Sequence, residues 1–352
     1  MKRPTRLLGA LLAVTIGVAA CSSTASTRGA VAPAAGTAPG DPAVQALPAA
    51  QLALVAYSTP QAAYEQIIKA FQATPQGKNI TFVTSYGASG DQSRAVEAGL
   101  AADIVNFSLA PDMSRLVKDG LVASTWNAGV NKGMVTDSVA VLVVRKGNPK
   151  SIKTWSDLTK PGIKVITPNP FTSGGARWNV MAAYGANSHV GTDDAAGTSY
   201  LRTLFKNVAV QDSSARAQLT TFTSGEGDVM IDYENDAIFA EQKNAAVDYV
   251  IPDQTILIEN PVAVTSKSKH PEQAKAFLDF LYTDTAQQIF AKNGYRPVVS
   301  GVNTSGSTFP TPPGLFTIAD LGGWTTVSTK FFDPISSVMA SIESSLGVSI
   351  KK

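Results

Sequence analysis

Short apolar strand patterns alternate with amphipathic helix patterns from Gln51 to Lys292. The first strand pattern covers Leu52 to Tyr57, and a helix pattern with one apolar face follows from Gln61 to Phe71. Such alternation predicts an α/β fold class with mainly parallel sheets, because parallel strands need crossover helices between them. The 352 residues exceed one ordinary core, so we expect two lobes with a hinge between them.

The N-terminus has the pattern of an export signal. A basic start within the first six residues is followed by an apolar run from Leu7 to Ala20, which is too short to span a bilayer well. We therefore expect residues 1–20 to be removed as a signal peptide. The small and aliphatic residues before Cys21 resemble a bacterial lipobox, which implies diacylation of Cys21 and anchoring to the cell membrane. The alternative is a generic signal peptide with an incidental cysteine.

Residues 21–50 are rich in Ala, Pro, Thr, Ser and Gly and show no periodicity. This composition predicts a flexible tether rather than a small folded subdomain. Cys21 is the only cysteine of the chain. A disulfide within the chain and a tetrahedral thiolate metal site are therefore excluded.

The charge balance argues against a nucleic-acid partner. Of the 29 basic residues, Lys2, Arg3 and Arg6 lie in the expected signal peptide, which leaves 26 against 27 acidic residues. The sequence contains no basic stripe and no interleaving of basic with aromatic residues, as nucleic-acid binding would require. A net charge near zero also gives little long-range electrostatic steering of an anion. Any specificity for an anion must therefore come from groups that contact it.

The segment from Thr167 to Asn179 carries the clearest site chemistry. A strand pattern over Ile163 to Ile166 leads into a Pro-Asn-Pro turn, and Ser173-Gly174-Gly175 then opens a helix pattern. The first N–H groups of a helix lack partners, and the helix dipole favours anions there. Glycine lets an oxyanion approach the backbone closely. The segment thus predicts a site that holds an anion with neutral donors.

Three other strand-to-helix junctions carry small hydroxyl or glycine residues. They are Ser58-Thr59, the Gly87-Ala88-Ser89-Gly90 segment and Ser213-Ser214-Ala215. Ligands of open α/β sheets bind beyond the carboxyl ends of the strands, so we expect all four junctions to converge. The alternative is simple helix capping, since Ser and Thr favour helix starts.

Several blocks give the chain from Leu54 to about Asp320 a family resemblance. The blocks are Tyr86–Gln92, Val144–Lys150, Thr167–Asn179, Asp212–Arg216, Gly227–Asn235, Lys292–Pro297 and Gly322–Thr325. The sequence resembles the periplasmic sulfate-binding and thiosulfate-binding proteins of bacterial ABC importers. This resemblance implies a two-lobed periplasmic-binding-protein (type II) architecture. Lobe 1 would comprise residues 51–136 and 260–318, and lobe 2 residues 137–259. Residues 319–352 would form a C-terminal helical tail with a helix near 335–346.

The resemblance also implies the ligand-binding residues, namely an interlobe set of neutral donors around a dehydrated sulfate. They are the backbone N–H groups of Ser58, Gly174, Gly175 and Ala215, the hydroxyls of Ser89 and Ser173, and Tyr233. At position 233 the family usually has a tryptophan, whereas molybdate-binding relatives use a tyrosine. A phenol can accept as well as donate a hydrogen bond. Thiosulfate, molybdate and tungstate therefore remain alternative ligands.

Arg177 and Arg216 stand beside these donors in the sequence. Their charges could orient the anion-binding loops, or they could form surface or interlobe salt bridges. The sequence leaves both possibilities open.

Catalysis and metal binding find little support. Ser173 could form a triad with His189 or His270, but no Gly-x-Ser-x-Gly elbow surrounds it. The acidic residues between Asp228 and Asp236 should alternate between strand faces, which argues against a metal site. We therefore expect no enzymatic activity, no metal and no cofactor.

The predicted function is that of a monomeric lipoprotein that binds sulfate and delivers it to an ABC permease. The alternative of another class is a surface lipoprotein acting as an adhesin or sensor partner.

Overall fold

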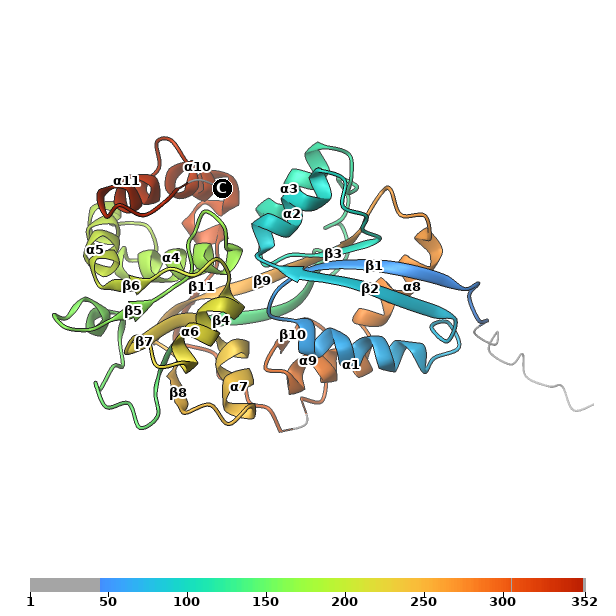
Figure 1. The fold of residues 1–352 in the computed structure, drawn as a ribbon, viewed down its shortest axis with the longest axis horizontal. Coiled ribbons are helices and arrows are strands. Elements are labelled where there is room, and N and C mark those ends of the chain that lie inside the picture. The colour runs from blue at the N-terminus through green and yellow to red at the C-terminus, as the bar shows by residue number, and fades with distance from the viewer. Residues whose placement is uncertain (1–44, 305, 351–352) are drawn as a thin grey trace, which may run out of the picture. The chain divides into compact units, whose positions relative to one another are not determined.

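The computed structural model describes residues 45–304 and 306–350. The predicted signal peptide, Cys21 and most of the predicted tether lie outside these residues. The described strands form one mixed sheet with the central order β2-β1-β3-β9-β4-β7-β5-β6 (Figure 1). The strands are β1 (Ala50–Tyr57), β2 (Ile80–Gly87), β3 (Ile104–Asn106), β4 (Met134–Arg145), β5 (Val165–Ile166), β6 (Val208–Val210), β7 (Val229–Tyr233), β8 (Val247–Val250), β9 (Gln254–Val264), β10 (Arg296–Pro297) and β11 (Gly314–Phe316).

Helices follow most of these strands, as the alternating sequence pattern predicts. They are α1 (Gln61–Gln72), α2 (Ser89–Glu97), α3 (Ala110–Lys118), α4 (Gly174–Asn187), α5 (Asp194–Lys206), α6 (Ala215–Thr223), α7 (Glu234–Gln242), α8 (Pro271–Leu281), α9 (Asp284–Lys292), α10 (Gly323–Phe332) and α11 (Val338–Ser345), with short 3₁₀ turns η1 (Trp155–Thr159) and η2 (Ala319–Leu321). The predicted α/β fold class is confirmed.

Parallel pairing occurs at the two ends of the sheet and between β11 and the central strand β9. Strand β1 pairs in parallel with β2 and β3, and β5 pairs in parallel with β6 and β7. The long strands β4 and β9 run antiparallel to each other and join the two ends, β9 through β3 and β4 through β7. Strand β4 can occupy this central place because its apolar run from Val139 to Val144 is buried on both faces.

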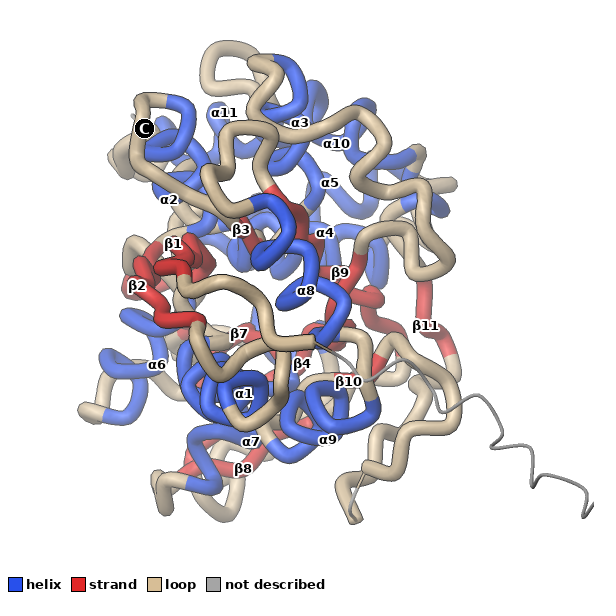
Figure 2. The backbone as a smooth tube through the Cα atoms, turned by 90° about the vertical axis from the view of Figure 1, so that its right-hand side faces the viewer, coloured by secondary structure: helices blue, strands red, loops and turns tan. Residues whose placement is uncertain are grey.

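Two groups of elements pack around separate hydrophobic cores. We call β1–β3 with α1–α3, α8 and α9 the first subdomain, and β5–β8 with α4–α7, α10 and α11 the second subdomain. Tyr64, Phe71 and Phe277 lie in the main core of the first, whereas Trp178 and Phe205 lie in that of the second. Figure 2 shows α2 and α3 on one side of the first-subdomain strands and α1 and α9 on the other. Figure 1 shows β4 and β9 running between the two groups.

The predicted helical tail, residues 319–352, contains α11 close to the helix predicted near 335–346, and it also contains α10, for which no separate helix was predicted. Two consecutive glycines, Gly322 and Gly323, are typical of a loop in the sequence. In the structure both have positive φ values, 90° and 76°, at the start of α10. The helix forms because its later apolar residues find a partner surface. For example, the ring centres of Phe331 and of Tyr184 in α4 are 4.6 Å apart. The tail is thereby part of the second-subdomain core.

Candidate anion-binding site

A small buried cavity lies where the first and second subdomains meet. Residues from both line it: Tyr57, Ser58, Thr59, Ala88, Ser89, Ser108, Ser173, Gly175, Ser214, Ala215 and Tyr233. The four junctions singled out in the sequence thus share one hollow. Its volume is about 10 Å³, close to the least space that can hold one water molecule. A cavity of this size leaves no room for a sugar or an amino acid, and a guest larger than water needs the two subdomains to move slightly apart.

Three helices begin at this cavity. Ser89 is the first residue of α2, Gly174 and Gly175 open α4, and Ala215 is the first residue of α6. Backbone N–H groups at these positions have no partner within their helices, and each helix dipole adds partial positive charge. Three such termini converge on one point, so the cavity is electropositive although none of the described residues that line it carries a charge.

The cap of α4 shows how a hydroxyl can serve both helix and ligand. The Ser173 oxygen accepts a hydrogen bond from the Ala176 N–H at 3.3 Å. Only an oxygen lone pair is used, so the hydroxyl proton stays available to the cavity. Ser214 caps α6 in the same way through the Ala217 N–H. Capping and ligand binding are therefore compatible at these junctions.

Six of the seven predicted donor residues line the cavity: Ser58, Ser89, Ser173, Gly175, Ala215 and Tyr233. Gly174 is not among the lining residues. It lies at the contact between the subdomains, where a Cβ atom built on it would be 2.0 Å from Ser108 Oγ. Its place in the donor set remains a prediction.

The structure corrects the role predicted for the Ser89 hydroxyl. This hydroxyl donates to Asp112 Oδ2 at 2.6 Å and accepts from the Ser108 N–H at 3.0 Å. Its single proton is therefore used within the first subdomain, and the Ser89 backbone N–H is the donor left for the cavity. The sequence could not reveal this, because Asp112 belongs to a different helix.

Two lining residues, Tyr57 and Ser108, lie outside the predicted junctions, whereas Thr59, Ala88 and Ser214 belong to those junctions but not to the predicted donor set. Thr59 is already paired, since its hydroxyl shares a hydrogen bond of 2.9 Å with the Tyr295 hydroxyl. Ser108 had a usable signal. It follows the apolar strand β3, and the rule that ligands bind beyond the carboxyl ends of strands would also have selected it.

Tyr233 ends β7 and is almost completely buried, with 1% of its surface exposed. Its hydroxyl has no hydrogen-bond partner among the described residues. Burial raises the pKa of the Tyr233 phenol well above its usual value, and the side-chain interaction with the Ser108 hydroxyl opposes this shift. The phenol therefore stays neutral and keeps a proton that it can donate to an anion.

Arg216 forms a salt bridge within the second subdomain and a hydrogen bond to the first. Its Nη2 donates to the Thr59 carbonyl of the first subdomain at 2.9 Å and lies 3.2 Å from Asp236 Oδ1 of the second. The guanidinium also stacks 4.1 Å from the Phe239 ring centre. Arg216 is thus a salt-bridge partner and also a tie between the subdomains, directly behind Ala215.

Arg177 supports the loop before α4. Its Nε donates to the Pro170 carbonyl at 2.9 Å, and its guanidinium lies 5.1 Å from the Phe332 ring centre. Burial lowers the pKa of Arg177, and the charge of Asp112 opposes this shift. Arg177 therefore braces the segment that presents Ser173 rather than lining the cavity itself.

A family model for the bacterial extracellular solute-binding proteins matches residues 52–296, which is more than half of the chain. The chain belongs to this family. A sulfate-binding protein of Synechococcus elongatus is 44% identical over 292 residues, covering 80% of this solute-binding protein and 83% of the relative. A thiosulfate-binding protein of Pseudomonas aeruginosa is 37% identical over 276 residues, covering 75% and 82%.

Among solved structures, the sulfate-binding protein SubI from Mycobacterium tuberculosis H37Rv superposes with a TM-score of 0.78 and 47% identity. The match covers 80% of this solute-binding protein and 99% of that chain. These similarities confirm the predicted fold class and family resemblance. They also agree with the expectation that the chain binds a solute and does not convert it.

The acidic residues of this solute-binding protein are arranged differently from the predicted strand alternation. Strand β7 ends at Tyr233, and α7 begins at the next residue, which brings Asp232 and Asp236 together inside the protein. Burial raises the pKa of Asp232, and repulsion from Asp236 acts in the same direction. The pair therefore carries less negative charge beside the cavity than two free carboxylates would. Glu234 instead pairs with Arg296 Nε at 2.7 Å.

The residues considered for a catalytic triad or a metal site do not lie together in the structure. Neither His189 nor His270 lines the cavity that contains Ser173. Residues 45–304 and 306–350 contain no group of three or more His, Cys, Asp or Glu side chains that could hold a metal ion. Over the same residues, no helix is long and apolar enough to cross a membrane.

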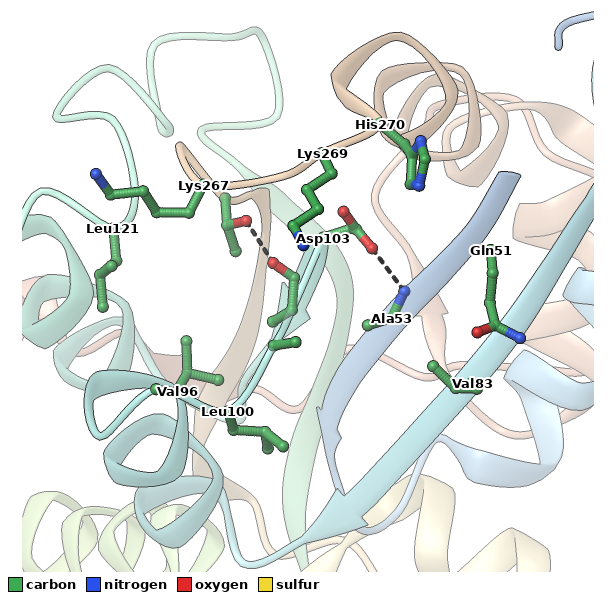
Figure 3. Close-up of a pocket in the computed structure, with 14 residues that line it drawn as sticks. Gln51, Ala53, Val83, Val96, Leu100, Asp103, Leu121, Lys267, Lys269 and His270 are labelled. Atoms are coloured by element: carbon green, nitrogen blue, oxygen red, sulfur yellow. Dashed lines mark hydrogen bonds between the residues drawn. The ribbon is translucent and has the colours of Figure 1, made fainter. Parts of the chain in front are cut away.

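A larger groove of about 450 Å³ lies on the first subdomain (Figure 3). Lys267, Lys269 and His270 flank it, and Asp103 at its centre accepts a hydrogen bond from the Ala53 N–H at 2.8 Å. None of the predicted site residues lines this groove. Size alone would not have selected the small cavity, whereas its convergent donors do.

Proposed function

We propose that this solute-binding protein captures sulfate outside the cytoplasmic membrane and delivers it to an ABC permease. The observation that carries the proposal is the uncharged, donor-rich cavity between the subdomains. Backbone N–H groups from three helix starts and the hydroxyls of Ser173 and Tyr233 surround a space for one small guest. The sulfate-binding relatives support the same ligand.

The energetics require several donors at once. Burying an uncompensated ion costs on the order of tens of kcal/mol, whereas one hydrogen bond to a charged group returns about 1.5–3 kcal/mol. Each helix terminus adds only about 0.3–1 kcal/mol. Directed hydrogen bonds from both subdomains must therefore supply most of the affinity. Six or seven fixed donors can offset the cost of desolvating the anion, whereas the donors of one motif alone cannot.

Selectivity follows from the same set of donors. Sulfate is fully ionised near neutral pH and offers only acceptors, which match N–H and O–H donors. Hydrogen phosphate brings a proton that most of this cavity cannot accept, and the unpaired group is penalised. Thiosulfate is the nearest alternative ligand, in line with the thiosulfate-binding relative. Molybdate or tungstate comes next, because Tyr233 can accept as well as donate.

The arrangement of donors also supports a hinge motion. The ligand would be enclosed on both sides, so the subdomains must separate for it to enter. We place the hinge where β4 and β9 pass between the subdomains, near Asp137 and Glu259, which are opposite each other in that strand pair. The two lobes would then be residues 51–136 with 260–318, and residues 137–259.

A calorimetric titration with sulfate tests the proposed ligand. We expect saturable binding of one sulfate per chain, weaker binding of thiosulfate and molybdate, and little heat from phosphate at the same ionic strength. Sulfate at a hundred times its Kd should stabilise the protein by about 2.7 kcal/mol in thermal unfolding. If no oxyanion gives heat or a thermal shift, sulfate capture is wrong and the adhesin or sensor-partner function is favoured.

We further propose that Cys21 carries the lipid that anchors the protein to the membrane. Two or more acyl chains give stable anchoring, and residues 21–50 have the composition of a tether. In a bacterial host, the wild-type chain should be found in the membrane fraction and Cys21→Ser in the soluble fraction, with equal sulfate binding. An equal distribution of the two forms between the fractions would contradict lipidation.

A further inference from the structure

Ser108 is held rigidly at the wall of the cavity. It lies two residues after β3, and its backbone is bound from three elements. Its N–H donates to Ser89 Oγ at 3.0 Å, and its carbonyl accepts from Trp178 Nε1 at 2.7 Å and from Asn260 Nδ2 at 3.0 Å. These partners belong to α2, α4 and β9. The backbone of Ser108 is therefore fixed, and only its hydroxyl can still rotate.

That hydroxyl makes no well-formed hydrogen bond within the first subdomain, although it lies near the Tyr233 hydroxyl. Ser108 is 1% exposed, and its Oγ makes no hydrogen bond to any of the described residues. The same holds for the Tyr233 hydroxyl, which lines the same cavity from the second subdomain. A buried hydroxyl without a partner costs free energy. Two of them facing one small cavity indicate groups kept for a guest.

We propose that the Ser108 hydroxyl donates a hydrogen bond directly to the bound oxyanion and adds to the donor set predicted from the sequence. The inference rests on the proposed function and extends it by one ligand contact. It also replaces the hydroxyl donor lost at Ser89, whose proton is bound to Asp112. The first subdomain then contributes one hydroxyl, from Ser108, and the second contributes two, from Ser173 and Tyr233.

Ser108→Ala in the full globular chain tests this contact. A hydrogen bond to a charged group is worth about 1.5–3 kcal/mol, so the sulfate Kd from calorimetry should rise about 10- to 100-fold. The thermal unfolding midpoint without sulfate should change little or rise, because the hydroxyl stabilises no contact within the protein. Weaker binding without loss of stability separates a ligand contact from a structural role.

Ser138→Ala is the matched control. Ser138 in β4 is fully buried, and its hydroxyl also lacks a partner among the described residues, but it does not line the cavity. Its removal should leave the sulfate Kd unchanged. If Ser108→Ala binds sulfate like the wild type, or if Ser138→Ala weakens binding equally, the contact is refuted. Failure of the wild type to bind sulfate would instead refute the proposed function.

Discussion

Gly174→Ala is expected to abolish tight sulfate binding while the ligand-free protein stays folded. A Cβ atom on residue 174 would lie 2.0 Å from Ser108 Oγ and 2.5 Å from Leu109 Cδ2. Both atoms belong to the first subdomain, so the clash arises only when the subdomains are closed. Overpacking typically costs about 1–3 kcal/mol, and the upper value corresponds to about a hundredfold weaker binding. Calorimetry with sulfate measures the loss.

The backbone of Gly174 gives no other reason for the effect. It is helical and has no positive φ, and alanine is favoured over glycine in a helix by about 0.5–1 kcal/mol. The unfolding midpoint without ligand should therefore be unchanged or higher. This combination of a stable fold and lost binding is what a steric block to closure predicts.

Gly185→Ala, in the same helix, is the informative comparison. Its added Cβ would lie 2.4 Å from the Phe316 ring, which belongs to the core around the second subdomain, so the clash cannot be relieved by opening. This variant should lose stability, while its folded fraction keeps the wild-type sulfate affinity. If Gly174→Ala binds sulfate normally, the closed arrangement of the cavity is not the binding state.

Ser173→Asp should eliminate sulfate binding by charge alone. Aspartate is as good an N-cap as serine and suits a helix N-terminus, so α4 should still form. Its carboxylate, however, would stand in the cavity and occupy the donors meant for the anion. Two unit charges 4 Å apart repel by about 4 kcal/mol at an effective dielectric constant of 20, and a dianion doubles this. The expected loss exceeds a thousandfold in a calorimetric titration.

Thr283→Asp provides the control for this substitution. Thr283 caps α9 through the Ala286 N–H at 3.4 Å, and it is an exposed residue of the first subdomain. The same change of cap there should leave sulfate affinity at the wild-type value. Measurable sulfate binding by Ser173→Asp, within tenfold of the wild type, would mean that residue 173 does not face the anion.

The architecture was largely predictable because strand and helix patterns are local. The helix that begins after Ser173 and the strand β1 were both expected from spacing and apolar periodicity. Helix α10 was not, because Gly322 and Gly323 break the local pattern and its stability comes from packing against α4. Propensity alone cannot report a contact between distant segments.

The candidate site was also predictable only in part from the sequence. Hydroxyls and glycines at strand-to-helix junctions are visible in the sequence, and six of the seven predicted residues do line one cavity. Which hydroxyl is free is not visible. The Ser89 proton is taken by Asp112, which is 23 residues away, and the Ser108 carbonyl is held by Trp178, which is 70 residues away.

By itself, the sequence determined where helices begin, which donors stand at their starts, and the family to which the chain belongs. These follow from neighbouring residues, through capping, glycine and apolar periodicity. Only the tertiary structure decided that Ser108 faces the cavity, that the Ser89 hydroxyl is paired with Asp112, and that Gly174 must lack a side chain for the subdomains to meet. Those outcomes depend on the volume and hydrogen bonds between distant segments, and local patterns carry no information about either.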